Sequence, residues 1–245
     1  MADIAPDRKE GWPVCESAGG DAHTTADLEI GATVSSSVGR QRRWENKPFQ
    51  LLAENVVLDL VNTLDFRFRA SGPEELLGRY ADLLRFLEEA GIVSAEQSRA
   101  LRESGTAEEQ GRVLDGVKDL RETLASIFYP RVEGEAPPAA SMERLEGFLR
   151  EMDQQKKLKW DGDRPEWAWT NAADDVRIPL WLLEEAVGEL LNSPAVEKVG
   201  RCCSADCGWL FVDTSKNHTR RWCNMKGCGN RMKARRHQAR RAGRG

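Results

Sequence analysis

Apolar residues through the middle of the chain recur every three or four positions, the spacing at which side chains share one face of a helix. This pattern predicts helices over residues 51–66, 71–90, 94–103, 107–129, 141–152 and 174–191. Between the last two, residues 157–170 alternate between polar and apolar positions, as the strands of a β-hairpin do. We therefore predict a mainly α body with one small β-hairpin, spanning residues 46–195.

The first 45 residues lack this periodicity and are rich in Gly, Ser, Ala and Thr. Such a composition buries too little apolar area to offset chain entropy, so we predict a disordered leader over residues 1–45, with Cys15 as a bystander. The N-terminus lacks the apolar stretch of a secretory signal, and no run of about 18 apolar residues indicates a membrane span. We expect a cytoplasmic protein with no membrane partner.

Positive charge is concentrated at the C-terminal end of the chain. The whole chain has a formal charge of -4, yet residues 201–245 hold nine arginines and three lysines against two aspartates, which gives +10. The other 200 residues therefore carry -14. An acidic body joined to a basic segment indicates a regulatory part attached to a part that binds a polyanion, and nucleic acid is the expected partner.

Four cysteines of the basic segment form two equally spaced pairs. Cys202 and Cys207 are followed, after fifteen residues, by Cys223 and Cys228. Each pair can wrap one side of a metal ion, so this spacing predicts one tetrahedral Zn²⁺. Six cysteines without an export signal favour metal binding over a disulfide framework. Equal spacing favours Cys202 over its neighbour Cys203, which then lies outside the site.

The predicted zinc site is structural. Four thiolates leave no open position for a substrate or water, although His218 and His237 are further candidate ligands. Residues 208–213 and 220–223 are predicted to form paired strands, with a helix starting at the second cysteine pair. Together they predict a treble-clef-like zinc finger. Because so small an element has little core, the metal should supply about 10–16 kcal/mol of apparent folding free energy.

The cysteine segment closely resembles the CGNR zinc finger over residues 199–241. The resemblance is carried by Cys228-Gly229-Asn230-Arg231 and by residues 207–215 and 220–223. Residues 57–64, which read Val-Leu-Asp-Leu-Val-Asn-Thr-Leu, resemble the start of the ABATE domain that usually precedes this finger in bacterial proteins. The resemblance implies DNA binding and regulation of transcription. Cys203 and the long leader depart from the usual pattern.

The helix after the metal site should carry most of the nucleic-acid contacts. Arg231, Arg235 and Gln238 share one stripe of this helix, and the other basic residues spread over the neighbouring one. Side chains placed in this way can reach phosphates and groove edges. The predicted nucleic-acid-binding residues are Arg220, Arg221, Arg231, Lys233, Arg235, Arg236, Arg240 and Arg241. A solvated cationic tail is the alternative interpretation.

Two polar residues interrupt an apolar helix of the body. Asp59 and Asn62 lie three positions apart, and a buried pair of this kind must be hydrogen-bonded. It either caps a neighbouring turn or lines a candidate ligand pocket, where a small-molecule or protein effector could bind the helical domain. For Trp209 and Trp222, packing against the helix after the metal site is favoured over stacking on bases. For Trp167 and Trp169, core packing is favoured over a ligand-stacking wall.

No pattern in the sequence indicates catalysis. A phosphate-binding Gly-Lys-Ser/Thr loop, a His-Glu-x-x-His motif and a nucleophile elbow are missing, and none of the three histidines lies in the body. We therefore expect a zinc-finger DNA-binding protein with three parts: the leader, a regulatory helical domain over residues 46–195 and the finger over residues 199–245. The alternative is an interaction adaptor whose basic finger binds an acidic protein or RNA.

Overall fold

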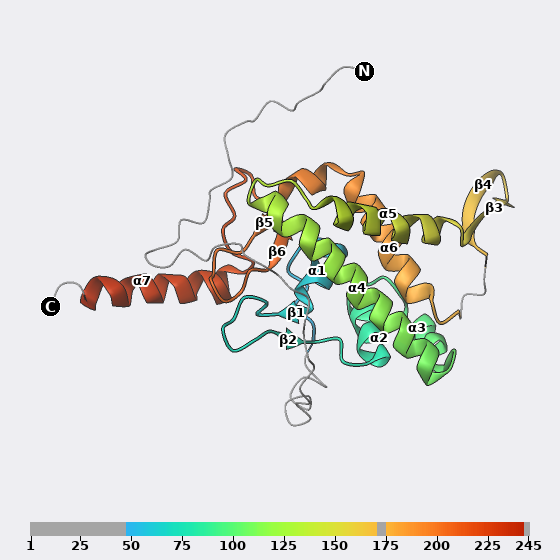
Figure 1. The fold of residues 1–245 in the computed structure, drawn as a ribbon, viewed down its shortest axis with the longest axis horizontal. Helices are drawn as coiled ribbons and strands as arrows, with labels where there is room; N and C mark the ends of the chain where they lie inside the picture. Colours follow the sequence, from blue (N-terminus) through green and yellow to red (C-terminus); the bar gives the residue numbers. More distant parts are fainter. Residues whose placement is uncertain (1–47, 171–174, 243–245) are drawn as a thin grey trace, which may run out of the picture. The chain divides into compact units, whose positions relative to one another are not determined.

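Helices account for most of the regular structure of this chain, and the strands form short antiparallel pairs (Figure 1). The computed structural model describes residues 48–170 and 175–242, so the expected leader over residues 1–45, with Cys15, lies outside the described residues. From Pro48 onward the chain forms one unit. The predicted mainly α fold with a small β-hairpin is confirmed.

The part that precedes the cysteine-rich segment is a helical body. Its helices are α1 (Val56–Asn62), α2 (Tyr80–Glu89), α3 (Ala95–Glu103), α4 (Ala107–Val132), α5 (Ala139–Asp153), α6 (Ile178–Leu191) and the 3₁₀ turn η2 (Pro194–Lys198). Its strands are β1 (Leu64–Asp65), β2 (Glu74–Glu75), β3 (Lys156–Asp161) and β4 (Arg164–Trp169). β1 pairs antiparallel with β2, and β3 with β4, so the hairpin predicted over residues 157–170 is confirmed.

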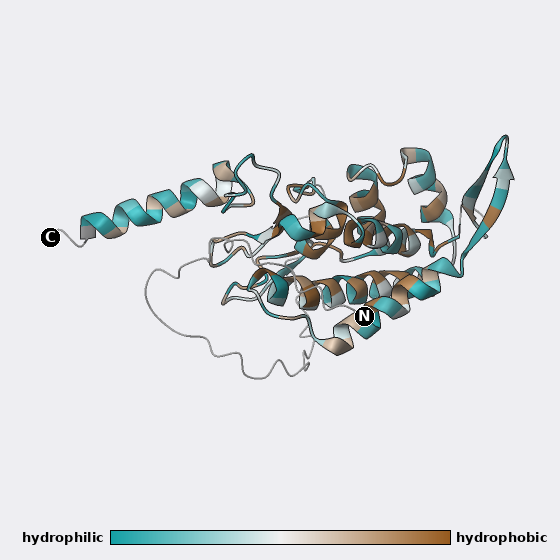
Figure 2. Cartoon of the chain, turned by 90° about the horizontal axis from the view of Figure 1, so that it is seen from above, coloured by the Kyte–Doolittle hydropathy of each residue, from teal (hydrophilic) through white to brown (hydrophobic). Residues whose placement is uncertain are grey.

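A shared apolar core holds the body together. The long helix α4 packs against α1, α2, α5 and α6, and Figure 2 shows the apolar sides of these helices turned toward one another. The largest fully buried side chains include Leu58, Leu60, Leu83, Leu84, Phe86, Leu120, Leu124 and Phe128. Burying one side chain of this size contributes about 1.5–3 kcal/mol. The regular apolar spacing seen in the sequence therefore determines which face of each helix is inside.

The first helix is shorter than the sequence predicted. The apolar pattern extends over residues 51–66, but α1 begins only at Val56, because the Asn55 side chain accepts a hydrogen bond from Val57 N at 2.9 Å. Such an N-cap satisfies an amide that has no partner within the helix. α1 ends at Asn62, and the residues that follow pair as β1 with β2.

The predicted start of the second helix is wrong. The sequence indicated a helix from Ser71, but Glu74 lies in β2, and Gly72 has a φ of +90°, which is outside the helical range. Helix α2 begins at Tyr80, where the carboxylate of Asp82 accepts a hydrogen bond from the Arg79 amide at 3.0 Å. The helix-start pattern at residues 71–74 is therefore overridden by the pairing of Glu74 and Glu75 with β1. That pairing could not be predicted from residues 71–74 alone, because β1 lies earlier in the chain.

Two prolines have different effects on their helices. Pro179 lies in the first turn of α6, where a proline removes no helical hydrogen bond. The sequence predicted that the helix starting at residue 107 ends at residue 129, just before Pro130, but α4 continues through Pro130 to Val132. The chain leaves α4 only at Gly134, whose φ of +85° favours glycine.

The two tryptophans of the hairpin share one face but differ in burial. Trp169 stacks on Trp181 of α6, with ring centroids 5.7 Å apart. Trp167 lies two residues before Trp169 in β4 and is 68% exposed, so its predicted core packing is wrong. Only the base of the hairpin reaches α6, because the strands lead away from the ends of α5 and α6 (Figures 1 and 2).

The cysteine-rich segment begins with a strand pair that the sequence assigned incorrectly. β5 (Val199–Arg201) pairs antiparallel with β6 (Leu210–Val212). The predicted partner of β6 was residues 220–223, but β5, which precedes the first cysteine pair, pairs with it instead. Leu210 is fully buried, and β6 joins the same apolar core as the helices of the body.

Glu184 is a buried carboxyl group that the sequence analysis did not single out. It lies on α6, is 2% exposed, and its Oε2 atom has no hydrogen-bond partner among the described residues. Burial, together with the nearby charge of Glu151, raises the pKa of Glu184 to about 8. The carboxyl group of Glu184 is therefore protonated at neutral pH.

Replacing Glu184 with Gln tests this protonation state. Between its ordinary pKa of 4.5 and about 8, the carboxyl group is ionised in the unfolded chain and protonated in the folded one. Wild-type stability should therefore fall as pH rises through this window, by at most about 1.4 kcal/mol per pH unit. Glu184→Gln should flatten the profile in urea unfolding, and the exposed Glu189→Gln should not. An unchanged profile in Glu184→Gln would contradict the assignment.

Candidate metal centre and basic helix

The first cysteine pair lies in a turn between two strands. Cys202 follows β5 and Cys207 precedes β6, and Cys202 N donates to Trp209 O at 2.8 Å, which closes the turn. Gly208 has a φ of +67°, and a Cβ atom there would lie 2.3 Å from the ring of Phe68. Both the backbone conformation and the packing at this position therefore require glycine.

The second cysteine pair leads directly into the C-terminal helix. Cys223 precedes η3 (Met225–Gly229), a wide helical turn that contains Cys228. The Asn224 side chain caps this turn by accepting a hydrogen bond from Lys226 N at 2.7 Å. α7 (Asn230–Ala242) follows without a break. Two cysteine turns, a strand pair and a terminal helix make a treble-clef-like layout, as predicted, although the strand pair encloses the first cysteine pair instead of lying between the two pairs.

Gly229 and Asn230 act through the backbone of this turn. A Cβ atom on Gly229 would lie 2.5 Å from Met225 Sδ, so any larger residue there would displace the Met225 side chain. Asn230 Nδ2 donates to Lys226 O at 3.3 Å, which ties the first residue of α7 back to the turn. Gly229 thus permits a close backbone approach, and Asn230 caps the turn with its side chain.

The sulfur atoms of Cys202, Cys207, Cys223 and Cys228 converge on one point. All four residues are buried, and their Sγ atoms lie within 4.8 Å of one another. The Sγ atom of Cys223 lies 3.7 Å from those of Cys207 and Cys228. A tetrahedral zinc ion with bonds of about 2.3 Å separates its sulfur ligands by about 3.8 Å. The four cysteines are thus positioned to bind one structural zinc ion.

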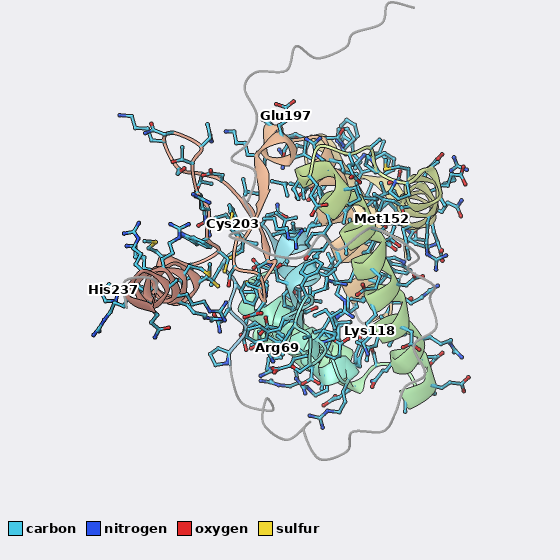
Figure 3. All side chains as sticks on the ribbon, turned by 60° about the vertical axis from the view of Figure 1, so that its left-hand side comes forward. Arg69, Lys118, Met152, Glu197, Cys203 and His237 are labelled. Carbon is cyan, nitrogen blue, oxygen red and sulfur yellow. The ribbon has the colours of Figure 1, made fainter. Side chains whose placement is uncertain are left out.

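The other candidate ligands lie outside this group. Among the residues that the structure describes, these four cysteines form the only cluster of three or more His, Cys or acidic side chains that could hold a metal. His218 is exposed, and its Nδ1 lies 3.2 Å from Asp213 O. Cys203 N donates to Arg221 O at 2.9 Å, so Cys203 helps to join the two cysteine turns through its backbone. His237 lies on α7 and is exposed (Figure 3).

Arg220 connects the finger to the body. Its Nη2 donates to Leu52 O at 2.9 Å and to Cys223 O at 2.7 Å, and its Nη1 donates to Val212 O at 3.3 Å. The guanidinium group is therefore committed to backbone carbonyls of the body, of β6 and of a metal ligand. These contacts give Arg220 a structural role, and its predicted role in binding nucleic acid stays a prediction.

Asn62 and Asp65 hold β6 and its preceding residue against the body. Asn62 Nδ2 donates to Leu210 O, and Leu210 N donates to Asn62 Oδ1, both at 2.9 Å. Trp209 Nε1 donates to Asp65 Oδ1 at 2.8 Å. The predicted burial of Trp209 is confirmed, since it is 7% exposed, whereas Trp222 is only half-buried. Trp209 bonds to the body, not to the basic helix.

Asp59 supports the same joint from within the body. Its Oδ1 accepts hydrogen bonds from Leu52 N and Ala53 N, both at 3.0 Å. The carbonyl of Ala53 in turn accepts a hydrogen bond from Val212 N of β6 at 2.8 Å. Burial raises the pKa of Asp59 to about 6. The carboxylate therefore orders the short segment to which the finger is bonded.

A ligand pocket was one of two roles expected for Asp59 and Asn62, and a cap on a neighbouring turn was the other. With Phe49, Thr63 and Trp209 they line a small hollow that has room for about one water molecule. Both side chains bond to backbone groups of the joint. These hydrogen bonds already explain why two polar side chains are buried here. A ligand role for the pair is not tested by them and stays a prediction.

Helix α7 presents its basic side chains to solvent. Figure 3 shows these side chains spread around the helix, and Figure 2 shows α7 as hydrophilic along its length. The exposed residues are Arg231, Lys233, Arg235, Arg236, Arg240 and Arg241. Arg221 lies before the second cysteine turn and is half-buried, with its guanidinium carbon 5.9 Å from the centre of the Trp222 ring.

Substitution of single cysteines tests the metal assignment. Cys223→Ser removes a ligand at the centre of the cluster, so we expect it to lose the zinc and to melt at a lower temperature. Cys203→Ser should keep one zinc per chain, because Cys203 lies outside the cluster. Elemental analysis of both purified variants measures this directly. Full zinc content in Cys223→Ser, or a loss of zinc only in Cys203→Ser, would show that the ligand set is different.

Substitution of Asn62 tests the joint between finger and body. Asn62→Ala leaves the buried N–H and C=O of Leu210 without their partners, and each unpaired group costs about 1–3 kcal/mol. We expect the free energy of unfolding to fall by about 2–4 kcal/mol in urea titrations. The matched control is Asn217→Ala in an exposed loop, with an expected change below about 0.5 kcal/mol. Equal stability of the two variants would refute the role of Asn62.

Comparison with known protein families assigns both parts of the chain. Residues 54–194 match the ABATE family, described as "Putative stress-induced transcription regulator", and residues 198–241 match the CGNR zinc finger. A comparison with curated proteins gave no match. In the described part of the chain, no helix is long and apolar enough to cross a membrane. Both resemblances noted in the sequence are confirmed, and the chain belongs to the ABATE family and carries a C-terminal CGNR zinc finger.

Proposed function

We propose that this chain is a zinc-finger DNA-binding protein that regulates transcription, with α7 as the element that contacts DNA. Membership in a family of transcription regulators supports the regulatory role, and the charge of α7 supports a polyanion as the partner. The helical body is then the regulatory part. We also propose that the protein acts in the cytoplasm and does not catalyse a reaction.

The uncompensated charge of α7 is the observation that carries this proposal. The helix has six Arg and Lys residues and no acidic residue. Of these, only Arg235 forms an ion pair within the described residues, with Asp206 at 3.0 Å. Like charges four residues apart, as in Arg231 with Arg235 and Arg236 with Arg240, destabilise a helix by about 0.2–0.5 kcal/mol per pair. Phosphate groups of a bound nucleic acid would remove this repulsion.

The dimensions of α7 suit the major groove of DNA. Its 13 residues span about 20 Å at a rise of 1.5 Å per residue. The major groove of B-DNA is about 12 Å wide and admits an α-helix. Arginine side chains around such a helix reach phosphates on both walls of the groove and guanine edges on its floor. The finger supports α7 through the η3 turn and the Arg235–Asp206 ion pair, and the residues from Arg236 to Arg241 are exposed.

RNA and an acidic protein are the alternative partners for the same helix. Phosphate contacts alone do not distinguish DNA from RNA, but the major groove of duplex RNA is too deep and narrow for side chains to read. An acidic protein offers carboxylates on one surface, whereas the basic residues of α7 surround the helix. Duplex DNA is therefore the partner that this distribution of charge favours.

Salt dependence of binding tests the proposal. The variant Arg236→Ala, Arg240→Ala, Arg241→Ala changes three exposed arginines that form no ion pair within the described residues. Each lost phosphate contact should flatten the log–log slope of affinity against salt by about 0.9, or about 2.7 for three. Fluorescence anisotropy with a labelled duplex measures the slope, and zinc content should stay at one per chain.

A charge-matched control separates local contacts from net charge. Arg99→Ala, Arg102→Ala, Arg112→Ala removes three exposed arginines from α3 and α4 and should leave the slope unchanged. Equal slopes for the wild type and the α7 variant would exclude α7 as the phosphate-binding element. Tighter binding to duplex RNA or to an acidic protein than to duplex DNA would favour the alternative partners.

A further inference from the structure

We propose that the apolar face of the β3–β4 hairpin binds the same face of a second copy of this chain. This face carries three large exposed side chains: Leu158 at 59%, Trp160 at 73% and Trp167 at 68% exposure. Large apolar side chains are seldom so exposed in a cluster unless the surface meets a partner. The inference is independent of the DNA-binding role of α7.

Strand register places these side chains together. Leu158 lies opposite Trp167, and Trp160 lies opposite Pro165. Because successive side chains of a strand point to opposite sides, residues two apart and their cross-strand partners share one face. The other face presents polar residues, such as Lys159 opposite Glu166. The hairpin therefore has one continuous apolar face and one polar face.

The body holds the hairpin at its base only. Trp169 stacks on Trp181 of α6, and the ammonium group of Lys156 is paired with Glu185. Those contacts account for the inner end of the apolar face. Leu158, Trp160 and Trp167 lie nearer the tip of the hairpin than these contacts. Because the three side chains are exposed, they do not take part in packing the hairpin against the body. Their size and arrangement therefore point to a function outside the monomer.

Charge and area favour a second copy as the occupant. Residues 156–169 contain four basic and three acidic side chains, so the hairpin lacks the charge excess that a polyanion or an acidic partner needs. At about 150–250 Å² per aromatic side chain, the three residues present roughly 400 Å² in each copy. Two copies would bury about twice this area, before the flanking side chains are added. That total of about 800 Å² falls short of the roughly 1,000 Å² expected of a weak specific interface, so the flanking side chains have to contribute the remainder.

A symmetric dimer places identical surfaces against each other, and the continuous apolar face of the hairpin is a surface of this kind. Figures 1 and 2 show the hairpin and α7 at opposite ends of the unit that starts at Pro48, so this dimer leaves both basic helices accessible.

Sedimentation equilibrium of the zinc-loaded full chain tests the proposal. From about 1 to 200 μM, the range expected for an interface of this size, the mean mass should rise from 27.5 kDa toward twice that value. The variant Trp160→Ser, Trp167→Ser should stay at the mass of one chain. Met142→Ser is the matched control, because Met142 is an exposed apolar residue of α5, at 44%, and its loss should leave dimerisation unchanged.

Circular dichroism and zinc content verify that each variant is folded. If the double variant does not fold, Leu158→Lys, which places a charge at the centre of the same exposed face, should abolish dimerisation in its place. A wild-type chain that stays monomeric throughout the range, or a folded hairpin variant that dimerises like the wild type, would overturn the proposal. A hairpin variant with weaker DNA binding and an unchanged mass would overturn it also, in favour of nucleic acid at this surface.

Discussion

The position of the basic helix depends on four thiolates that meet at one metal ion. Cys223 and Cys228 enclose the turn from which α7 starts, and the other two ligands tie that turn to the β5–β6 strand pair. Without the ion, four buried thiol groups would have little reason to converge, and the finger has few apolar residues beyond β6. Metal binding and the placement of α7 are therefore parts of one folding event.

The metal centre is also built into the body, not attached to it by a linker. Asp59 orders residues 52–53, whose carbonyls accept hydrogen bonds from Arg220 and Val212, and Arg220 continues to the carbonyl of Cys223. Asn62 and Asp65 add bonds to β6 and Trp209. A series of hydrogen bonds therefore links α1, through residues 52–53 and Arg220, to the metal ligand Cys223. The body therefore determines the orientation of the finger.

Local features of the sequence predicted the site better than they predicted its surroundings. Ligand identity follows from cysteine spacing, and the exposure of α7 follows from its charge, because both are set within a few residues. The partner of β6 and the role of Arg220 could not be predicted in the same way, since Arg220 bonds to Leu52, a residue far away in the chain. Glu184 was overlooked because a single acid within an apolar stripe resembles an ordinary surface position.

In the proposed function, α7 is the element that contacts DNA, and its order depends on the zinc centre. Hydrogen exchange of the full chain, with and without duplex DNA and with and without a chelator, measures this most directly. A helix of 13 residues with little tertiary support should exchange rapidly when free. Slower exchange in α7 on addition of DNA, lost when zinc is removed, is the predicted result. Unchanged exchange in α7, with protection elsewhere in the chain, would contradict the account.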